Sequence, residues 1–98
     1  MFLLASCGAG LVVWPGTGLF EDRHWHAYCR AGDRALEHGG LDWAEKMYRK
    51  ALQLAYQQED EEKVRQSYLR LHRLYLAQGQ HQLAAQMLAL SRASWPRP

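Results

Sequence analysis

Apolar residues recur at steps of three and four along the chain from residue 22 onward, which is the spacing of one face of an α-helix. Good helix formers dominate this part, proline is absent until Pro96, and the period-two alternation of strands is missing. The pattern therefore predicts an all-α fold. We expect four helices, over about residues 22–38, 43–57, 61–78 and 81–94.

The residues between these segments are typical helix ends. Gly39 and Gly79 follow the first and third helices, where glycine readily adopts the left-handed conformation that ends a helix. Asp42, with Glu45 three residues later, matches a capping box at the start of the second helix. Asp60 is placed to cap the third helix.

The four segments fall into two similar halves when the chain is shifted by forty residues. A fixed period in the range of about 20–50 residues is the mark of a solenoid built from repeated units. Identical residues coincide at several positions, pairing Tyr28 with Tyr68, Arg30 with Arg70, Leu36 with Leu76, Gly39 with Gly79, Ala44 with Ala84, and Met47 with Met87.

Each half resembles the tetratricopeptide repeat (TPR) family, which alternates aromatic, glycine and alanine positions over a helix pair. The first unit has Tyr28, Gly32, Gly39, Ala44, Tyr48 and Ala51; the second has Tyr68, His72, Gly79, Ala84, Leu88 and Ser91, followed by Pro96. The resemblance implies two antiparallel helix pairs stacked as a short TPR-like solenoid. Gly32, Ala44 and Ala84 would then lie where helices approach closely.

The second unit departs from the family pattern at His72, where glycine is usual, and the period exceeds the usual ~34 residues. We expect a longer linker in the middle, or longer helix ends, to absorb the difference. An ordinary four-helix bundle is the alternative. Two units are few for a solenoid, so we expect self-association, a covering partner, or a place within a longer repeat protein.

In this family the first helix of each pair lines a concave groove that binds peptides. Carried over by position, that groove would contain His26, Cys29, Asp33, Glu37, Gln66, Leu69 and Arg73. The lysines and asparagines with which chaperone-binding members hold a peptide carboxylate are replaced here, which disfavours that ligand. The mixed charges would suit a helix or an extended peptide that carries both signs.

The first twenty residues carry no charged side chain, so we place a boundary between an apolar segment, 1–20, and a helical domain, 21–98. Three interpretations stay open: a membrane anchor, the remnant of an export signal around Cys7, and a disordered leader. The anchor would make the protein membrane-associated rather than cytoplasmic.

The charge is nearly balanced, with 12 Lys and Arg against 10 Asp and Glu, which argues against nucleic acid as a partner. Arg65, Arg70 and Arg73 make one side of the third helix basic, which could contact an acidic partner or anionic lipid. Candidate ligands near Cys29 lack the convergence of a metal site, and no nucleophile motif is present. We expect no metal, no cofactor and no enzymatic activity.

These observations predict a scaffold for protein–protein interaction that binds a protein or peptide partner, and residues 1–20 could tether it to a membrane. The alternative is a structural or assembly subunit whose helices complete a larger solenoid.

Overall fold

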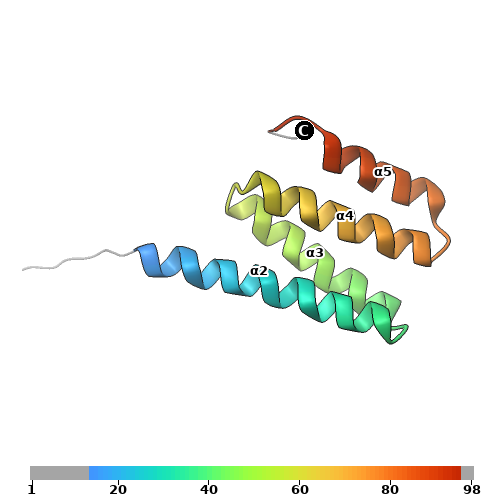
Figure 1. The fold of residues 1–98 in the computed structure, drawn as a ribbon, viewed down its shortest axis with the longest axis horizontal. Helices are drawn as coiled ribbons and strands as arrows, with labels where there is room; N and C mark the ends of the chain where they lie inside the picture. The colour runs from blue at the N-terminus through green and yellow to red at the C-terminus, as the bar shows by residue number, and fades with distance from the viewer. Residues whose placement is uncertain (1–13, 96–98) are drawn as a thin grey trace, which may run out of the picture.

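The computed structural model describes residues 14–95, with side chains from residue 23 onward. Within this range four helices follow one another as antiparallel neighbours: α2 (Trp14–Glu37), α3 (Leu41–Gln57), α4 (Glu61–Ala77) and α5 (His81–Arg92). Over these residues the prediction of an all-α fold is confirmed (Figure 1).

Three turns of the same kind join the helices, at intervals of twenty residues. In each turn one residue has a positive φ, and the next amide donates a hydrogen bond to a carbonyl five residues earlier, as in a Schellman motif. The positive-φ residues are Gly39 (80°), Glu59 (53°) and Gly79 (75°). Both glycine ends were therefore predicted correctly, whereas Glu59 was missed.

The expected longer linker in the middle is wrong, because the connection between α3 and α4 has the same three-residue form as the other two. The period of forty residues comes from the helices themselves. Both α3 and α4 are 17 residues long, and each is followed by a three-residue turn.

Glu59 has the one positive φ outside glycine among the described residues, and this conformation costs a side-chain-bearing residue about 1–2 kcal/mol. We expect Glu59→Gly to stabilise the chain by about 1 kcal/mol, which raises Tm by roughly 4–8 °C in a domain of this size. Thermal unfolding followed by circular dichroism measures the change.

Two further variants, one at this turn and one at the turn of Gly39, separate the effect of the positive φ from the loss of charge. Glu59→Ala removes the carboxylate but keeps the strained φ, so it should not raise Tm. Gly39→Ala should lower Tm, because nothing lies within 4 Å of the added Cβ and only the positive φ opposes it. Equal stabilisation by Glu59→Ala and Glu59→Gly would contradict the role assigned to φ.

The predicted caps had different outcomes. Asp60 caps α4 as expected, since its Oδ1 accepts a hydrogen bond from the Lys63 amide at 3.1 Å. Asp42 does not cap α3, because the helix already begins at Leu41, with Gly40 as the N-cap and no side-chain hydrogen bond. Asp42 lies instead in the first turn, where a carboxylate favours the positive end of the helix dipole.

The predicted start of the first helix is wrong, because α2 begins at Trp14 and not near residue 22. Pro15 is compatible with this start, since a first-turn residue has no helical partner for its amide. The glycines that follow cost only about 1 kcal/mol each in a helix. The helix thus runs through the change of composition at residue 20, and the division into two domains stays a prediction.

Residues 1–13 of the apolar segment lie outside the described residues. Within 14–95, none of the helices combines the length and apolar character that a membrane crossing needs.

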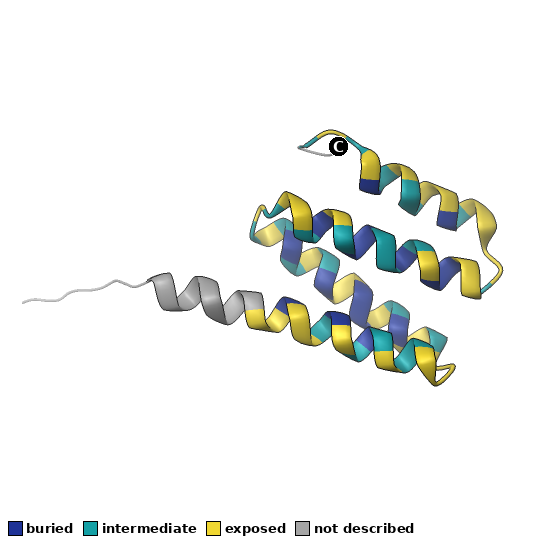
Figure 2. Cartoon of the chain, in the orientation of Figure 1, coloured by how far each residue is buried: buried dark blue, intermediate teal, exposed yellow. Residues whose placement is uncertain are grey.

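Two clusters of buried side chains form the core, and α3 and α4 contribute to both. Buried positions occur on all four helices (Figure 2). One cluster joins α2, α3 and α4 through Trp25, Cys29, Ala51, Ala55, Val64 and Tyr68. The other joins α3, α4 and α5 through Ala44, Tyr48, Leu71, Leu74, Tyr75 and Ala84. The predicted close-contact residues Ala44 and Ala84 are fully buried. Larger side chains at these positions would separate the helices.

The two helix pairs differ in how they divide a small and a large residue between their first and second helices. In the first pair the aromatic ring of Tyr48 lies so close to α2 that a Cβ on Gly32 would be 2.4 Å from it. In the second pair the corresponding positions hold His72 and Leu88, and His72 Nδ1–H donates to the Ala84 carbonyl at 2.8 Å. The departure of His72 from the family pattern is thus accompanied by a smaller residue at the facing position.

Candidate functional site

Polar side chains attach α2 to α4, the first helices of the two pairs. Trp25 Nε1 donates to Ser67 Oγ at 3.0 Å, and the Ser67 hydroxyl donates to the Lys63 carbonyl at 2.8 Å. Both Trp25 and Ser67 are buried. Because its hydroxyl is engaged in this way, Ser67 holds the helices together and is not placed as a nucleophile.

Asp33 is the second attachment point between these helices. Its Oδ1 accepts a hydrogen bond of 2.5 Å from the Tyr48 hydroxyl on α3, and Arg70 Nε on α4 lies 3.4 Å from the same oxygen. Burial, together with the bond to the carboxylate, raises the pKa of Tyr48. Asp33 is half-buried and engaged, so a partner that reached it would compete with the contacts that join three helices.

Cys29 is placed in the core, contrary to its assignment to the groove. It is 2 % exposed and packs in the cluster shared by α2, α3 and α4. Burial raises the pKa of its thiol to about 11, so the thiol is protonated near neutral pH. The family position suggested a surface residue, but Trp25 and Cys29, four residues apart, share the buried face of α2.

Three of the other predicted groove residues lie together on α4. Gln66, Leu69 and Arg73 are spaced three and four residues apart, so they share a helix face, and they line a hollow of about 310 Å³ with Arg70 and His72. Arg73 is exposed and Leu69 is half-buried, which gives the hollow a cationic and an apolar component.

His26 and Glu37 lie on α2, and neither lines this hollow. Both are exposed, and the His26 ring packs edge-on against Trp25 with centroids 4.9 Å apart. The structure therefore brings together the α4 half of the predicted groove and leaves these two α2 residues as separate exposed positions.

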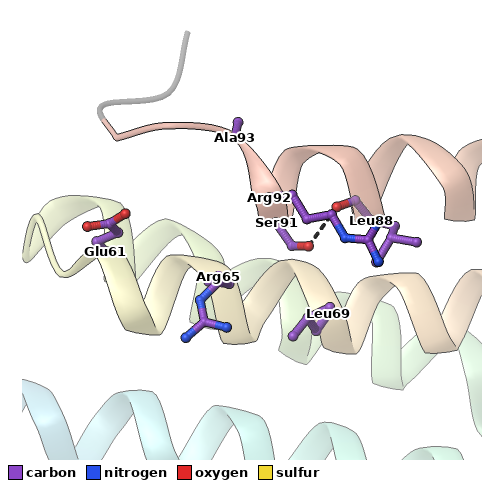
Figure 3. Close-up of a pocket in the computed structure, with 7 residues that line it drawn as sticks. All are labelled: Glu61, Arg65, Leu69, Leu88, Ser91, Arg92 and Ala93. Atoms are coloured by element: carbon purple, nitrogen blue, oxygen red, sulfur yellow. Dashed lines mark hydrogen bonds between the residues drawn. The ribbon is translucent and has the colours of Figure 1, made fainter.

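A second hollow, of about 390 Å³, lies between α4 and the C-terminal end of α5 (Figure 3). It is lined by Glu61, Arg65 and Leu69 from α4, and by Leu88, Ser91, Arg92 and Ala93 from the other side. The groove prediction included only Leu69 among these. The shift of forty residues could have indicated this hollow, since it aligns the lining residues Leu69 and Leu88 with Cys29 and Tyr48 of the first unit.

The arrangement offers recognition surfaces, whereas Asp33, Tyr48 and Arg70 are engaged in contacts between helices. Within the described part of the chain, no three His, Cys, Asp or Glu side chains come together as metal ligands would. Comparison with protein-family models, with curated proteins and with solved structures found no match to this chain.

Proposed function

We propose that the chain is a protein–protein interaction scaffold of the TPR-like type, which binds a peptide or helix on the face formed by α2 and α4. The observation that carries the proposal is the pair of attachments between these helices, Trp25 to Ser67 and Asp33 to Arg70. They hold the first helix of each pair beside the other, which is the arrangement that a groove lined by first helices requires.

The regularity of the chain also supports a stacked arrangement of helix pairs. Identical turns recur every twenty residues, and the alanines that repeat after forty residues are both fully buried. Extensive packing joins only helices that follow one another in the described part of the chain, α2 with α3, α3 with α4, and α4 with α5. A closed four-helix bundle would also pack its last helix extensively against its first.

Binding would use shape and charge, with no covalent step and no cofactor. The hollow on α4 offers Leu69 as an apolar contact, flanked by the exposed guanidinium of Arg73 and the amide of Gln66. On α2, outside this hollow, the exposed Glu37 carboxylate and His26 imidazole offer further polar contacts. A ligand that carries both acidic and basic residues would match this surface.

Arg73→Glu tests the groove. We expect the variant to lose capture of the partner by about tenfold, since reversing a charge at a contact surface costs on the order of 1–2 kcal/mol. Co-purification from cells, followed by titration of the identified partner against the full chain, measures the effect. Glu37→Lys is the companion variant on α2.

The control for this experiment is Lys50→Glu, which changes the charge equally at an exposed position on α3. Asp33 is not suitable for the test, because replacing it would leave the buried Tyr48 hydroxyl without its acceptor. Undiminished capture by Arg73→Glu would refute the assignment of the groove.

A structural role within a larger helical assembly is the second candidate, and the hollow between α4 and α5 favours it. A stoichiometric partner that keeps an otherwise aggregating chain in solution would support that role. The membrane tether through residues 1–20 remains a separate proposal. Fractionation of cells that express the full chain or residues 21–98 tests it, since release of the shorter chain alone from membranes is expected.

A further inference from the structure

The hollow between α4 and α5 corresponds to a groove that is already occupied in the first helix pair. Shifting the chain by forty residues places Leu69, Leu88 and Ser91 on Cys29, Tyr48 and Ala51 of α2 and α3. In the first pair, these positions are covered by α4, whose Val64, Tyr68 and Leu71 are buried in the core. A groove of this form therefore accepts a helix with apolar residues at steps of three and four.

The groove of the second pair differs from the first in its charge. At the position of the buried Trp25 it has Arg65, and Arg92 lies on the opposite wall. The guanidinium of Arg65 contacts Glu62 in an exposed pair one turn earlier, and such pairs contribute little and exchange readily. The walls thus offer two cations above an apolar floor of Leu69 and Leu88.

The C-terminal part of the sequence has the same sign of charge. All ten acidic residues lie between Glu21 and Glu62, and none follows. The basic residues from position 63 to the end are Lys63, Arg65, Arg70, Arg73, Arg92 and Arg97. Glu61 is the one acidic residue of the hollow, and it lies at the start of α4. Among the residues that line the hollow, two guanidinium groups therefore outnumber one carboxylate, which gives the groove a net positive charge.

A second copy of the chain does not complement this groove. To continue the stack, it would have to insert α2, which has His24 and Ala31 where α4 has Val64 and Leu71. The same helix carries the exposed cations Arg30 and Arg34, which would meet Arg65 and Arg92 with like charge.

We propose that the groove between α4 and α5 binds an amphipathic helix of a partner protein whose polar flanks are acidic. The apolar stripe of that helix would cover Leu69 and Leu88, and its carboxylates would pair with Arg65 and Arg92. This surface is separate from the groove on α2 and α4, although Leu69 borders both. Arg92 and Leu88 line only the groove between α4 and α5, so variants at these two residues identify it.

The test uses the full chain and a synthetic helical probe derived from α4. The probe spans residues 61–77 with Lys63→Glu, Arg65→Glu, Arg70→Glu and Arg73→Glu, and it keeps Val64, Tyr68 and Leu71. We expect saturable binding, measured by fluorescence anisotropy of the labelled probe. The affinity should fall at least about tenfold with Arg92→Glu and should also fall with added salt.

Matched controls establish whether the probe binds at this groove. The double variant Arg30→Glu/Lys50→Glu changes exposed charges of the first pair and should bind the probe as the original chain does. Leu88→Gln should weaken binding while circular dichroism reports intact helices. A peptide with the natural α4 sequence should not bind, which excludes exchange of the probe for α4 itself.

Several outcomes would overturn the proposal. These are no saturable binding of the acidic probe, equal binding to the Arg92→Glu variant, and equal loss with the control variant. Binding to phosphatidylserine vesicles that is lost in Arg92→Glu, with none to the probe, would instead assign the cations to a membrane surface. Arg73→Glu is measured beside these, so that failure of this site and failure of the groove on α2 and α4 are told apart.

Discussion

Gly32→Ala should destabilise the fold by about 2–3 kcal/mol, although alanine is normally the better helix former by about 1 kcal/mol. The added Cβ would lie 2.4 Å and 2.6 Å from two ring carbons of Tyr48. Tyr48 cannot move aside freely, because its side chain is fully buried and its hydroxyl donates to Asp33. Chemical denaturation of both chains gives the difference in free energy of unfolding.

The double variant Gly32→Ala/Tyr48→Leu shows whether the ring is the cause. Leucine is the residue that the second helix pair has at the matching position, Leu88. In a double-mutant cycle the alanine should cost less in the Tyr48→Leu background than in the original chain, which gives a favourable coupling energy. If Gly32→Ala is neutral or stabilising by itself, the close contact between α2 and Tyr48 is refuted.

Raising the pH above 9 should lower the stability of the chain steeply. An ordinary cysteine thiol loses its proton near pH 9, whereas burial raises the pKa of Cys29 in the folded chain to about 11. In this window the unfolded state binds fewer protons than the folded state, so stability falls as the pH rises. Cys29 alone should account for about 2 kcal/mol between pH 8 and about pH 10.5.

Two tyrosines extend the loss of stability to higher pH. Burial, with a hydrogen bond to Asp33, raises the pKa of Tyr48, and burial with a bond to Glu45 raises that of Tyr75. Both therefore contribute stability below pH 10 that is lost as the pH rises further. Denaturation series at intervals from pH 7 to 11 measure the slope, and ultraviolet absorbance reports tyrosinate formation.

Single variants show which side chain causes the loss of stability at alkaline pH. Cys29→Ala should flatten the decline between pH 9 and 11, and Tyr48→Phe should flatten it above pH 10. The comparison uses slopes, since each variant also changes the stability at neutral pH. A free energy of unfolding that stays constant from pH 8 to 11 in the original chain would show that these groups are not buried as described.

The sequence by itself determined the local features of this protein. Helices appear where apolar residues recur at steps of three and four, Gly39 and Gly79 end them with positive φ, and Asp60 caps α4. Each of these depends on contacts within a few residues of the chain, so the spacing of residue types is sufficient. The burial of Ala44 and Ala84 also follows, because small residues repeated at one position indicate close helix contact.

Only the tertiary structure decided which way each helix is turned and what its polar residues contact. Cys29 was placed in the groove by family position, but packing against α3 and α4 buries it. Asp33 accepts bonds from residues 15 and 37 positions away, and Glu59 adopts a glycine-like φ because the paired helices impose the same turn three times. Such features depend on partners that come together only when the helices pack, and no local spacing specifies them.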